Sequence, residues 1–303
     1  MSLRIAPRIQ EALAKGLPLV ALESTLITHG LPQPRNLETA AELEETVREA
    51  GAVPATVAIL AGELVVGASS EELERLAHGE PQKASLWNLA ALLAQGANAG
   101  TTVATTLYTA AAAGITVFAT GGIGGVHPQP FDESADLMAL SRYPVLTVCA
   151  GPKSILLTGA TLERLETLGV PVVGYRSQRL AGFHVRETEH ALPASFDDAR
   201  GIAEAFQLHR QLGLSGGMLV SNPVSEGLGQ DELDSYRAAA QSEAQEAQIS
   251  GRELTPFLLA RLAELSSART VDVNLRLLRE NVALAARVAQ EIARPIPRGA
   301  HHE

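Results

Sequence analysis

Two polar residues that could do chemistry stand at the ends of short apolar runs. Glu23 ends the run Pro18–Glu23, and Lys153 follows the run Val145–Cys149. A carboxyl group in such a place can act as a general acid, although a role in a local turn or cap is more common. A lysine in apolar surroundings can lose its proton and attack a carbonyl carbon, whereas most lysines are solvated or bind phosphate. Proton transfer with Schiff-base chemistry is therefore one interpretation of the pair, beside purely structural roles.

A glycine-rich segment and an acidic segment lie between these two residues in the chain. Gly121–Gly125, followed by His127, supplies backbone that can approach an anion closely, or that only makes a tight turn. The acidic segment falls in the expected first turn of a helix, where the helix dipole favours acids whatever their function. Its polar members are Asp132, Glu133, Ser134 and Asp136. A metal or sugar site is one hypothesis for this segment, and ordinary acids at a helix start are the other.

Lys83 and Asn274 are ambiguous on their residue types alone. Lys83 borders residues 84–131, which contain no Asp, Glu, Lys or Arg, and it could be an ordinary surface cation. Glycines and polar residues interrupt this uncharged stretch, so it lacks the about 20 consecutive apolar residues of a membrane span. We expect two buried helices and a buried strand there instead. Asn274 lies on the apolar face of an expected helix and is either a satisfied core amide or a base-reading group.

Short apolar strands alternate with helices along the chain. We expect strands at Pro18–Glu23, Ala55–Leu60, Glu63–Val66, Ile115–Ala119, Val145–Cys149, Val170–Val173 and Met218–Ser221. We expect helices at Asn36–Ala50 with Asn36 as the cap, from Ser69 through Ala77, and at Thr102–Ala113, Thr161–Leu168, Phe196–Leu212, Asp231–Gln248, Thr255–Leu265 and Val273–Ile292.

This order predicts an α/β fold, a single-domain α/β/α sandwich with a mostly parallel central sheet. Residues 1–303 are expected to form one domain, with a core at about 18–290 and a loose tail at 295–303. Ligands of open α/β sheets bind at the carboxyl ends of the strands. Glu23 and Lys153 are both expected at that edge.

Composition excludes several classes of protein. The 303 residues carry 24 Lys+Arg against 34 Asp+Glu, for a formal net charge of −10. A protein with this negative net charge does not suit binding to a nucleic-acid polymer, although a small anion can still bind in a local pocket. Cys149 is the only cysteine, which rules out a disulfide framework and a Cys-based zinc site. Residues 1–16 contain no apolar signal-peptide core, so we expect a cytoplasmic protein without membrane segments.

Three familiar motifs do not fit their required context. Gly213–Gly217 matches G-x-S-x-G, but a helix precedes it and a strand follows, the reverse of a nucleophile elbow. Gly151–Ser154 resembles the end of a P-loop without the upstream glycine and the adjacent Gly-Lys pair. His184 and His190 lack the spacing of a zinc-binding helical pair. None of the three supports a function.

Eight long motifs, in order, resemble the pseudouridine-5′-phosphate glycosidase family, which includes the indigoidine synthase A-like proteins. They are Val20–Thr25 with Thr28–Gly30, Gly51–Thr56, Val117–His127, Phe131–Leu137, Cys149–Ile155, Val170–Tyr175, Ser221–Pro223 and Thr255–Arg261. The resemblance spans about residues 18–290. It implies an α/β/α fold, a homotrimer and a Mn²⁺-dependent enzyme. The implied reaction reversibly converts pseudouridine 5′-phosphate and water to uracil and ribose 5-phosphate, in the catabolism of pseudouridine.

The resemblance also implies roles for individual residues. The family's proton donor falls on Glu23, its Schiff-base lysine on Lys153 and its metal-ligand aspartate on Asp132. Its substrate contacts fall on Lys83, Val103, Ser134, Ala135 and Asp136, and positions that line its pocket fall on His127 and Asn274.

The chain departs from the family pattern around two of these positions. Ala84–Asn88, after Lys83, lacks the charges that family members often carry, and the loop after His127 looks short. Two other functions stay open: a Schiff-base lyase or aldolase acting on another sugar phosphate, and a catalytically silent sugar-phosphate-binding protein. The expected partners are the small-molecule substrate, further copies of the chain and, in the pathway, a separate pseudouridine kinase.

Overall fold

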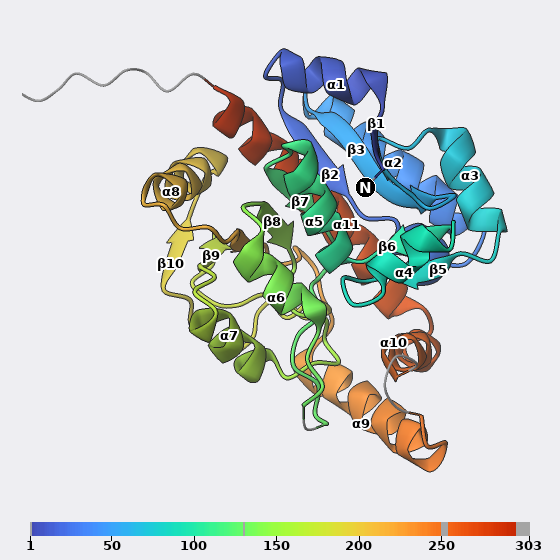
Figure 1. The fold of residues 1–303 in the computed structure, drawn as a ribbon. Coiled ribbons are helices and arrows are strands. Elements are labelled where there is room, and N and C mark those ends of the chain that lie inside the picture. The colour runs from blue at the N-terminus through green and yellow to red at the C-terminus, as the bar shows by residue number, and fades with distance from the viewer. Residues whose placement is uncertain (1, 130, 250–253, 295–303) are drawn as a thin grey trace, which may run out of the picture.

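The computed structural model describes residues 2–129, 131–249 and 254–294 (Figure 1). Its first half contains β1 (Leu3–Ile5), α1 (Pro7–Ala14), β2 (Leu19–Leu22), the π-helical turn η1 (Leu26–Gly30), α2 (Arg35–Glu49), β3 (Val53–Leu60), β4 (Glu63–Val66), α3 (Ser70–His78), β5 (Gln82–Ala84), α4 (Leu89–Ala94), β6 (Ala99–Thr101), α5 (Val103–Ala113) and β7 (Val117–Ala119). Its second half contains α6 (Ala135–Arg142), β8 (Leu146–Cys149), α7 (Thr158–Thr167), β9 (Val172–Tyr175), β10 (Ala194–Phe196), α8 (Ala199–Gln211), β11 (Met218–Ser221), α9 (Gln230–Glu246), α10 (Leu254–Leu265) and α11 (Arg269–Ala293).

The strands form one sheet in the order β1-β4-β3-β2-β7-β8-β11-β9-β10, and β6 links β5 to β3. Every pair from β3 through β2, β7, β8, β11 and β9 to β10 is parallel. Strands β4 and β6 run antiparallel to β3. The predicted α/β fold with a mostly parallel sheet is therefore confirmed. That all described strands join one sheet supports the single-domain organisation, which stays a prediction.

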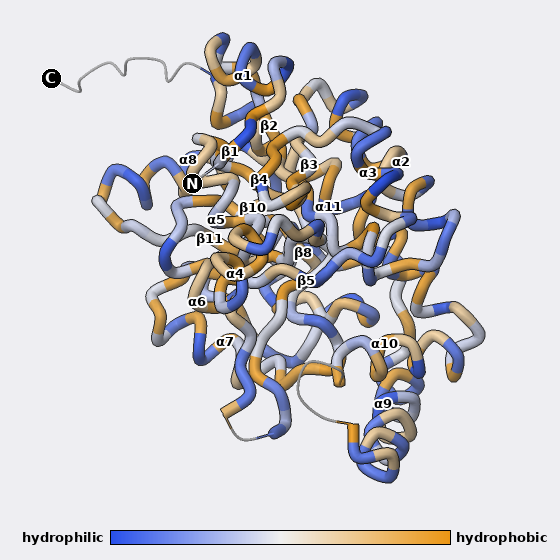
Figure 2. The backbone as a smooth tube through the Cα atoms, turned by 45° about the vertical axis from the view of Figure 1, so that its right-hand side comes forward, coloured by the Kyte–Doolittle hydropathy of each residue, from blue (hydrophilic) through white to orange (hydrophobic). Residues whose placement is uncertain are grey.

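Helices cover both faces of the sheet, because successive side chains of a strand point to opposite sides. In β7, Val117 and Ala119 pack into a core shared with α2, α8 and α11, whereas Phe118 packs into a core shared with α1, α5, α6 and α7. In Figure 1, α5 and α6 lie in front of the strands and α11 lies behind them. Figure 2 shows the hydrophilic segments chiefly at the periphery. In the described part of the chain, no helix is long and apolar enough to cross a membrane.

The helix and strand predictions are mostly confirmed to within a few residues, but the cap of α2 is wrong. The helix begins at Arg35 because Pro34 already starts the turn. The buried Asn36 amide donates to the Ile27 carbonyl and accepts from the backbone N–H of Leu37. The residue therefore anchors α2 to the turn η1. The predicted capping box is confirmed, because Ser69 and Glu72 bond reciprocally at the start of α3.

Several short elements have no recognisable sequence pattern. Strands β1, β5, β6 and β10 have only three residues each, too few to show a period of two. Strand β10 occupies Ala194–Phe196, so the helix predicted from Phe196 begins only at Ala199. Helix α1 was also missed. The predicted tail at 295–303 lies outside the described residues.

Candidate functional site

Three neighbouring strands deliver the predicted catalytic residues to one edge of the sheet. Leu22 of β2 pairs with Ala119 of β7, and Ala119 pairs with Val148 of β8. Glu23 and Thr120 therefore leave the sheet side by side, and the segment that carries Lys153 begins next to them. This placement agrees with the carboxyl-edge position expected from the sequence.

Glu23 is held by two threonine hydroxyls. Thr25 donates to Oε2 of Glu23, and Thr120, at the end of β7, donates to Oε1. The carboxylate is half-buried, so part of it remains open to a ligand. Hydroxyls that donate to both oxygens fix the orientation of the carboxylate without neutralising it. Glu23 is thus presented at the edge in one orientation, which suits a group that transfers a proton.

The glycine loop runs beside the segment that leads to Lys153. The backbone N–H of Ile123 donates to the Gly151 carbonyl at 3.1 Å, and the N–H of Lys153 donates to the Ile123 carbonyl at 3.0 Å. Close packing explains the glycines: a Cβ on Gly122 would lie 2.6 Å from two ring carbons of Phe183, and a Cβ on Gly124 would lie 2.2 Å from Ser134 Oγ. The loop therefore fixes the backbone of Lys153.

Asp136 joins the glycine loop to the start of α5. Its buried carboxylate accepts the backbone N–H of Ala104 through Oδ1 at 2.9 Å and that of Gly124 through Oδ2 at 2.8 Å. The Gly124 N–H is consequently engaged and is not free to bind an anion. A carboxylate has further lone pairs, so a sugar hydroxyl could still donate to Asp136. Asp136 is thus a predicted sugar contact that has a structural role as well.

The remaining members of the acidic segment take different places. Ser134 is the N-cap of α6, accepting from the Asp136 N–H, and Ala135 is the first helical residue. Asp132 and Glu133 precede the cap, so the expectation that they fall in the first turn is wrong; a short bridge pairs Glu133 with Val126. Val103 is the buried first residue of α5 and directly precedes Ala104, whose N–H donates to Asp136.

Lys83 enters the site from β5, at the same edge. Burial lowers the pKa of Lys83, and repulsion from Lys153 lowers this pKa further, while attraction to Asp136 and Glu23 opposes the shift. The residue is exposed to solvent although protein atoms crowd its ammonium group, so we expect only a partial effect of burial. Burial and then Lys83 also lower the pKa of His29. Lys83, Lys153, Glu23 and Asp136 are therefore close enough to interact, and we refer to them as the cluster.

His127 and Asp132 form the other side of the cluster. The backbone N–H of His127 donates to the backbone carbonyl of Asp132 at 2.9 Å. Burial lowers the pKa of His127, with Asp132 opposing the shift and Lys153 adding to it. His127 Nδ1 is buried and has no hydrogen-bond partner among the described residues, and the same holds for Oγ1 of Thr102 at the start of α5. Buried polar atoms are rarely left unpaired, so both atoms suit contacts to a bound ligand.

The donor set around Asp132 suits a cation held mostly by water. Among the described residues, no three or more His, Cys, Asp or Glu side chains converge on one point as a metal site. A single half-buried carboxylate fits Mn²⁺, which favours carboxylate and water oxygens. It does not fit a tightly caged structural metal.

Asn274 reaches the glycine loop from α11. Its Oδ1 lies 3.3 Å from the position that a Cβ on Gly121 would occupy. The half-buried amide therefore faces the predicted site rather than the middle of the core. Its base-reading role stays a prediction.

Sequence reasoning missed four polar residues at this edge. They are Thr25, Thr120, Asn222 and Asn281. The two threonines adjoin residues that were singled out. Asn281 follows Asn274 by two helical turns in α11, a spacing that places both on one helix face. That spacing was the available signal.

A buried Ser154–His184 pair lies directly after Lys153. Ser154 Oγ and His184 Nδ1 lie 2.8 Å apart in a hydrogen bond, and both residues are buried. Burial lowers the pKa of His184 from 6.5 to about 3. His190 instead lies 3.2 Å from Thr158 Oγ1, so the two histidines do not converge on a metal.

The His184 shift predicts a pH-dependent stability. Because the folded-state pKa is depressed, His184 takes up a proton near pH 6.5 only when unfolded, so its contribution is complete above that pH and is lost as the pH falls toward 3. Between pH 7 and 5 the free energy of unfolding should fall by about 2 kcal/mol from this residue. Urea unfolding of His184→Gln should lack that part of the fall. The exposed histidine variant His78→Gln should keep it, and equal falls in all three proteins would contradict the assignment.

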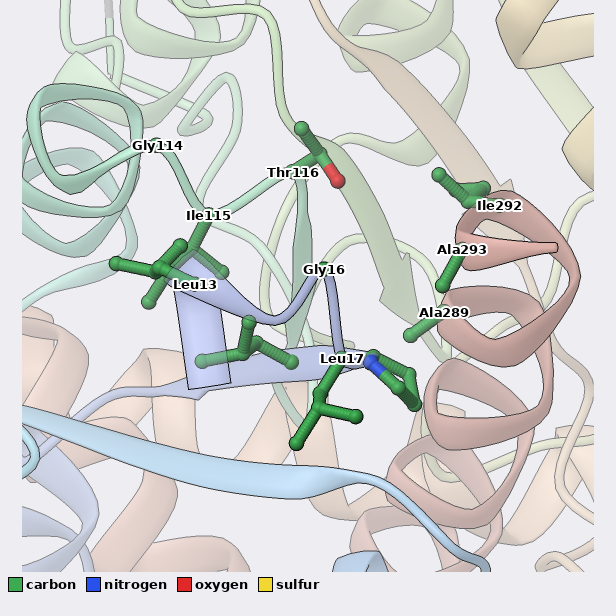
Figure 3. Close-up of a pocket in the computed structure, with 11 residues that line it drawn as sticks. Leu13, Gly16, Leu17, Gly114, Ile115, Thr116, Ala289, Ile292 and Ala293 are labelled. Atoms are coloured by element: carbon green, nitrogen blue, oxygen red, sulfur yellow. The ribbon is translucent and has the colours of Figure 1, made fainter. Parts of the chain in front are cut away.

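A separate apolar groove lies at the opposite edge of the sheet. It has a volume of about 180 Å³ and is lined by residues at the start of β2 and β7 and the end of α11. Figure 3 shows Leu17, Thr116 and Ile292 around it. None of the described residues that line this groove is charged, so it does not suit a phosphate ester, and it is not part of the candidate site.

A parallel sheet that gathers two lysines, two carboxylates and a glycine loop at its carboxyl edge is the arrangement of an α/β enzyme. A family model described as "Indigoidine synthase A like protein" matches residues 8–291. The chain belongs to this family.

Relatives of known name align with almost the whole chain. The pseudouridine-5′-phosphate glycosidase of Thermus thermophilus is 57% identical over 276 residues, covering 91% of this chain and 98% of the relative. The protein of the same name from Escherichia coli is 46% identical, covering 96% of each chain. The similarity at this level shows that the chain is an enzyme.

Two solved structures have the same fold. The prealnumycin C-glycosynthase AlnA, determined in complex with ribulose 5-phosphate, superposes with a TM-score of 0.90 at 36% identity and 97% coverage of both chains. An indigoidine synthase A-like protein from Thermotoga maritima superposes with a TM-score of 0.89 at 34% identity, again covering 97% of both.

Proposed function

We propose that this enzyme reversibly cleaves the carbon–carbon glycosidic bond of pseudouridine 5′-phosphate, giving uracil and ribose 5-phosphate. The observation that carries the proposal is the convergence of Lys153, Glu23 and Lys83 at one sheet edge. The 57% identity to a relative named for this substrate supports the choice of substrate. The sugar phosphate bound to the structural relative AlnA supports a phosphosugar as ligand.

The bond to be broken explains why an amine is needed. It joins C1′ of ribose to C5 of uracil, so its electrons cannot depart onto a ring nitrogen as they do from an ordinary nucleoside. The paired carboxylates of a typical glycosidase lack the electron push that this cleavage requires. A lysine nitrogen attached to C1′ supplies it.

The proposed sequence begins at Lys153. Its neutral Nζ forms a bond to C1′ as the bond from C1′ to the ring oxygen breaks. The ring oxygen takes up a proton and the new ammonium nitrogen releases one, so the nitrogen regains its lone pair. The nitrogen lone pair then forms an iminium as the C1′–C5 bond breaks, and C5 takes both the bonding electrons and a proton. Water adds to the iminium, releasing open-chain ribose 5-phosphate and the free amine. Glu23 is the group we assign to these proton transfers.

The other site residues bind and orient the substrate in this proposal. Lys83 supplies positive charge for a phosphate or another anionic group. Ser134 and Asp136 hold sugar hydroxyls, next to the backbone at Val103 and Ala135. His127 offers its Nδ1, for which the described residues supply no partner, and Asn274 reads the base edge.

The metal and the partners are part of the proposal as well. Asp132 would hold Mn²⁺ mainly through water molecules; when bound, the ion supplies positive charge beside the polar substrate. We also propose a homotrimer and a separate pseudouridine kinase that makes the substrate, because the family implies both.

The direct test is an assay of uracil with ribose 5-phosphate and Mn²⁺, with product detection by mass spectrometry. Pseudouridine 5′-phosphate should form, and the purified product should be cleaved in the reverse direction. A panel of other sugar phosphates and other acceptors distinguishes a lyase or aldolase with a different substrate. Turnover of another pair without pseudouridine 5′-phosphate would overturn the proposed substrate, and binding without any turnover would leave a silent binding protein.

A further inference from the structure

Two asparagines outside the predicted site connect the ends of three strands and one helix. Asn281 of α11 is fully buried, and its Nδ2 donates to the Thr120 carbonyl at 2.9 Å and to the Gly121 carbonyl at 3.2 Å. Its Oδ1 accepts from Nδ2 of Asn222 at 2.9 Å. Asn222 follows β11, and its backbone N–H donates to the Cys149 carbonyl at 2.8 Å.

These bonds satisfy the Asn281 amide almost completely. Both Nδ2 hydrogens have carbonyl acceptors, and Oδ1 has a donor. A leucine of similar size would leave the Thr120 carbonyl and the Asn222 amide without these partners in the core, which is costly. A helix–sheet contact needs no polar group at such a position, so the amide calls for an explanation beyond packing.

The carbonyls that Asn281 holds belong to residues that position the chemistry. Thr120 donates its hydroxyl to Glu23, so the orientation of the Thr120 backbone sets the place of that donor. The Gly121 carbonyl also accepts the Ala150 N–H at 2.9 Å, which aligns the glycine loop with the segment leading to Lys153. Asn281 therefore reaches Glu23 through one intervening residue, Thr120. Through the Gly121 carbonyl it is also connected to the segment that leads to Lys153.

We propose that Asn281, fixed by Asn222, is a positioning residue that acts through Thr120 on the Glu23 carboxylate. This inference rests on the proposed function for its kinetic consequence, but not for its geometry. A displacement of about 1 Å at a reacting group can cost on the order of 100-fold in rate. We therefore expect Asn281→Leu to lower kcat about 10- to 100-fold while KM changes less than about threefold.

A double-mutant cycle with Thr120→Val tests the route of the effect. If Asn281 acts through the Thr120 hydroxyl, the double variant Thr120→Val/Asn281→Leu should be no more than about threefold slower than the slower single variant, because the second change removes an interaction already lost. Multiplication of the two losses would overturn the proposal. Val288→Ala, in the buried face of the same helix, should lower stability without lowering kcat.

Two further variants keep the test valid if Asn281→Leu does not fold. Asn281→Asp keeps the shape and can still accept from Asn222, but the carboxylate offers no N–H to the two carbonyls, so its kcat should fall as in the leucine variant. Asn222→Ala removes the anchor of Oδ1 and should lower kcat in the same direction by a smaller factor. Wild-type kcat in both variants would overturn the proposal.

A structural readout separates this inference from the proposed function. Crystal structures of the wild type and the Asn281 variants should show the Thr120 hydroxyl parted from Glu23 only in the variants. If the contact persists in the variants, the positioning inference fails whatever the substrate. If the contact is lost but the wild type does not turn over pseudouridine 5′-phosphate, the inference stands and only the proposed substrate fails.

Discussion

Lys153→Ala is expected to lower turnover of pseudouridine 5′-phosphate by about 10⁴-fold or more, because it removes the amine that forms the carbon–nitrogen bond. The backbone bond to Ile123 holds Lys153 in place, and no other amine in the cluster is held in that position. The substitution lies at a half-buried position, so the fold should persist. Mass spectrometry of the uracil and ribose 5-phosphate assay measures the loss.

Lys153→Arg is the matched control for charge. A guanidinium keeps the positive charge but stays protonated, so it cannot attack C1′. We expect this variant to be as inactive as the alanine variant while still binding ribose 5-phosphate. Borohydride with ribose 5-phosphate should add mass at Lys153 of the wild type alone. An adduct on Lys83, or activity in the arginine variant, would contradict the assignment.

Glu23→Gln is expected to lower kcat by about 10²- to 10⁴-fold, the usual contribution of a positioned acid–base group. The amide can still accept hydroxyl hydrogen bonds from Thr25 and Thr120, but it cannot transfer a proton. Steady-state kinetics of cleavage measures the loss, and we expect KM to change much less than kcat.

Glu44→Gln is the matched control for Glu23→Gln. Glu44 is also a glutamate that protein atoms cover, and it accepts a hydrogen bond from the Thr56 hydroxyl at 2.6 Å. It lies on α2 and is not part of the candidate site. Its substitution should change stability with less than about a threefold change in kcat. An equal loss of activity in both variants would mean that Glu23 matters for the fold and not for the chemistry.

Much of the sheet and the position of the candidate site could be predicted from local sequence. The central strands are buried on both faces, so they appear as continuous apolar runs with clear ends. Glu23 and Lys153 follow such ends, and the edge they share follows from the parallel order. The glycine run also stands directly after a strand, although the close contacts that require its glycines involve Ser134 in the next segment and Phe183 far along the chain.

The connections among these residues could not be predicted in the same way. Asp136 looked like a helix-dipole acid or a ligand, and its bonds to Ala104 and Gly124 depend on how α5 and the loop pack. The cap predicted at Asn36 failed because the amide satisfies a carbonyl of η1 instead. A single asparagine in a helix does not reveal which distant carbonyl it will reach.

The position of α11 at the end of the described chain has a consequence for the order of assembly. Asn281 bonds to residues 160 and 161 positions earlier, and α11 packs against β2, β7 and β8 behind the sheet (Figure 1). A nascent chain that has already presented Glu23, the glycine loop and Lys153 to solvent still lacks the helix that ties them together. Bringing ends so far apart together costs loop-closure entropy before any contact repays it. We therefore expect catalytic competence to arise only after α11 has been synthesised and has docked, and not gradually as each strand joins the sheet.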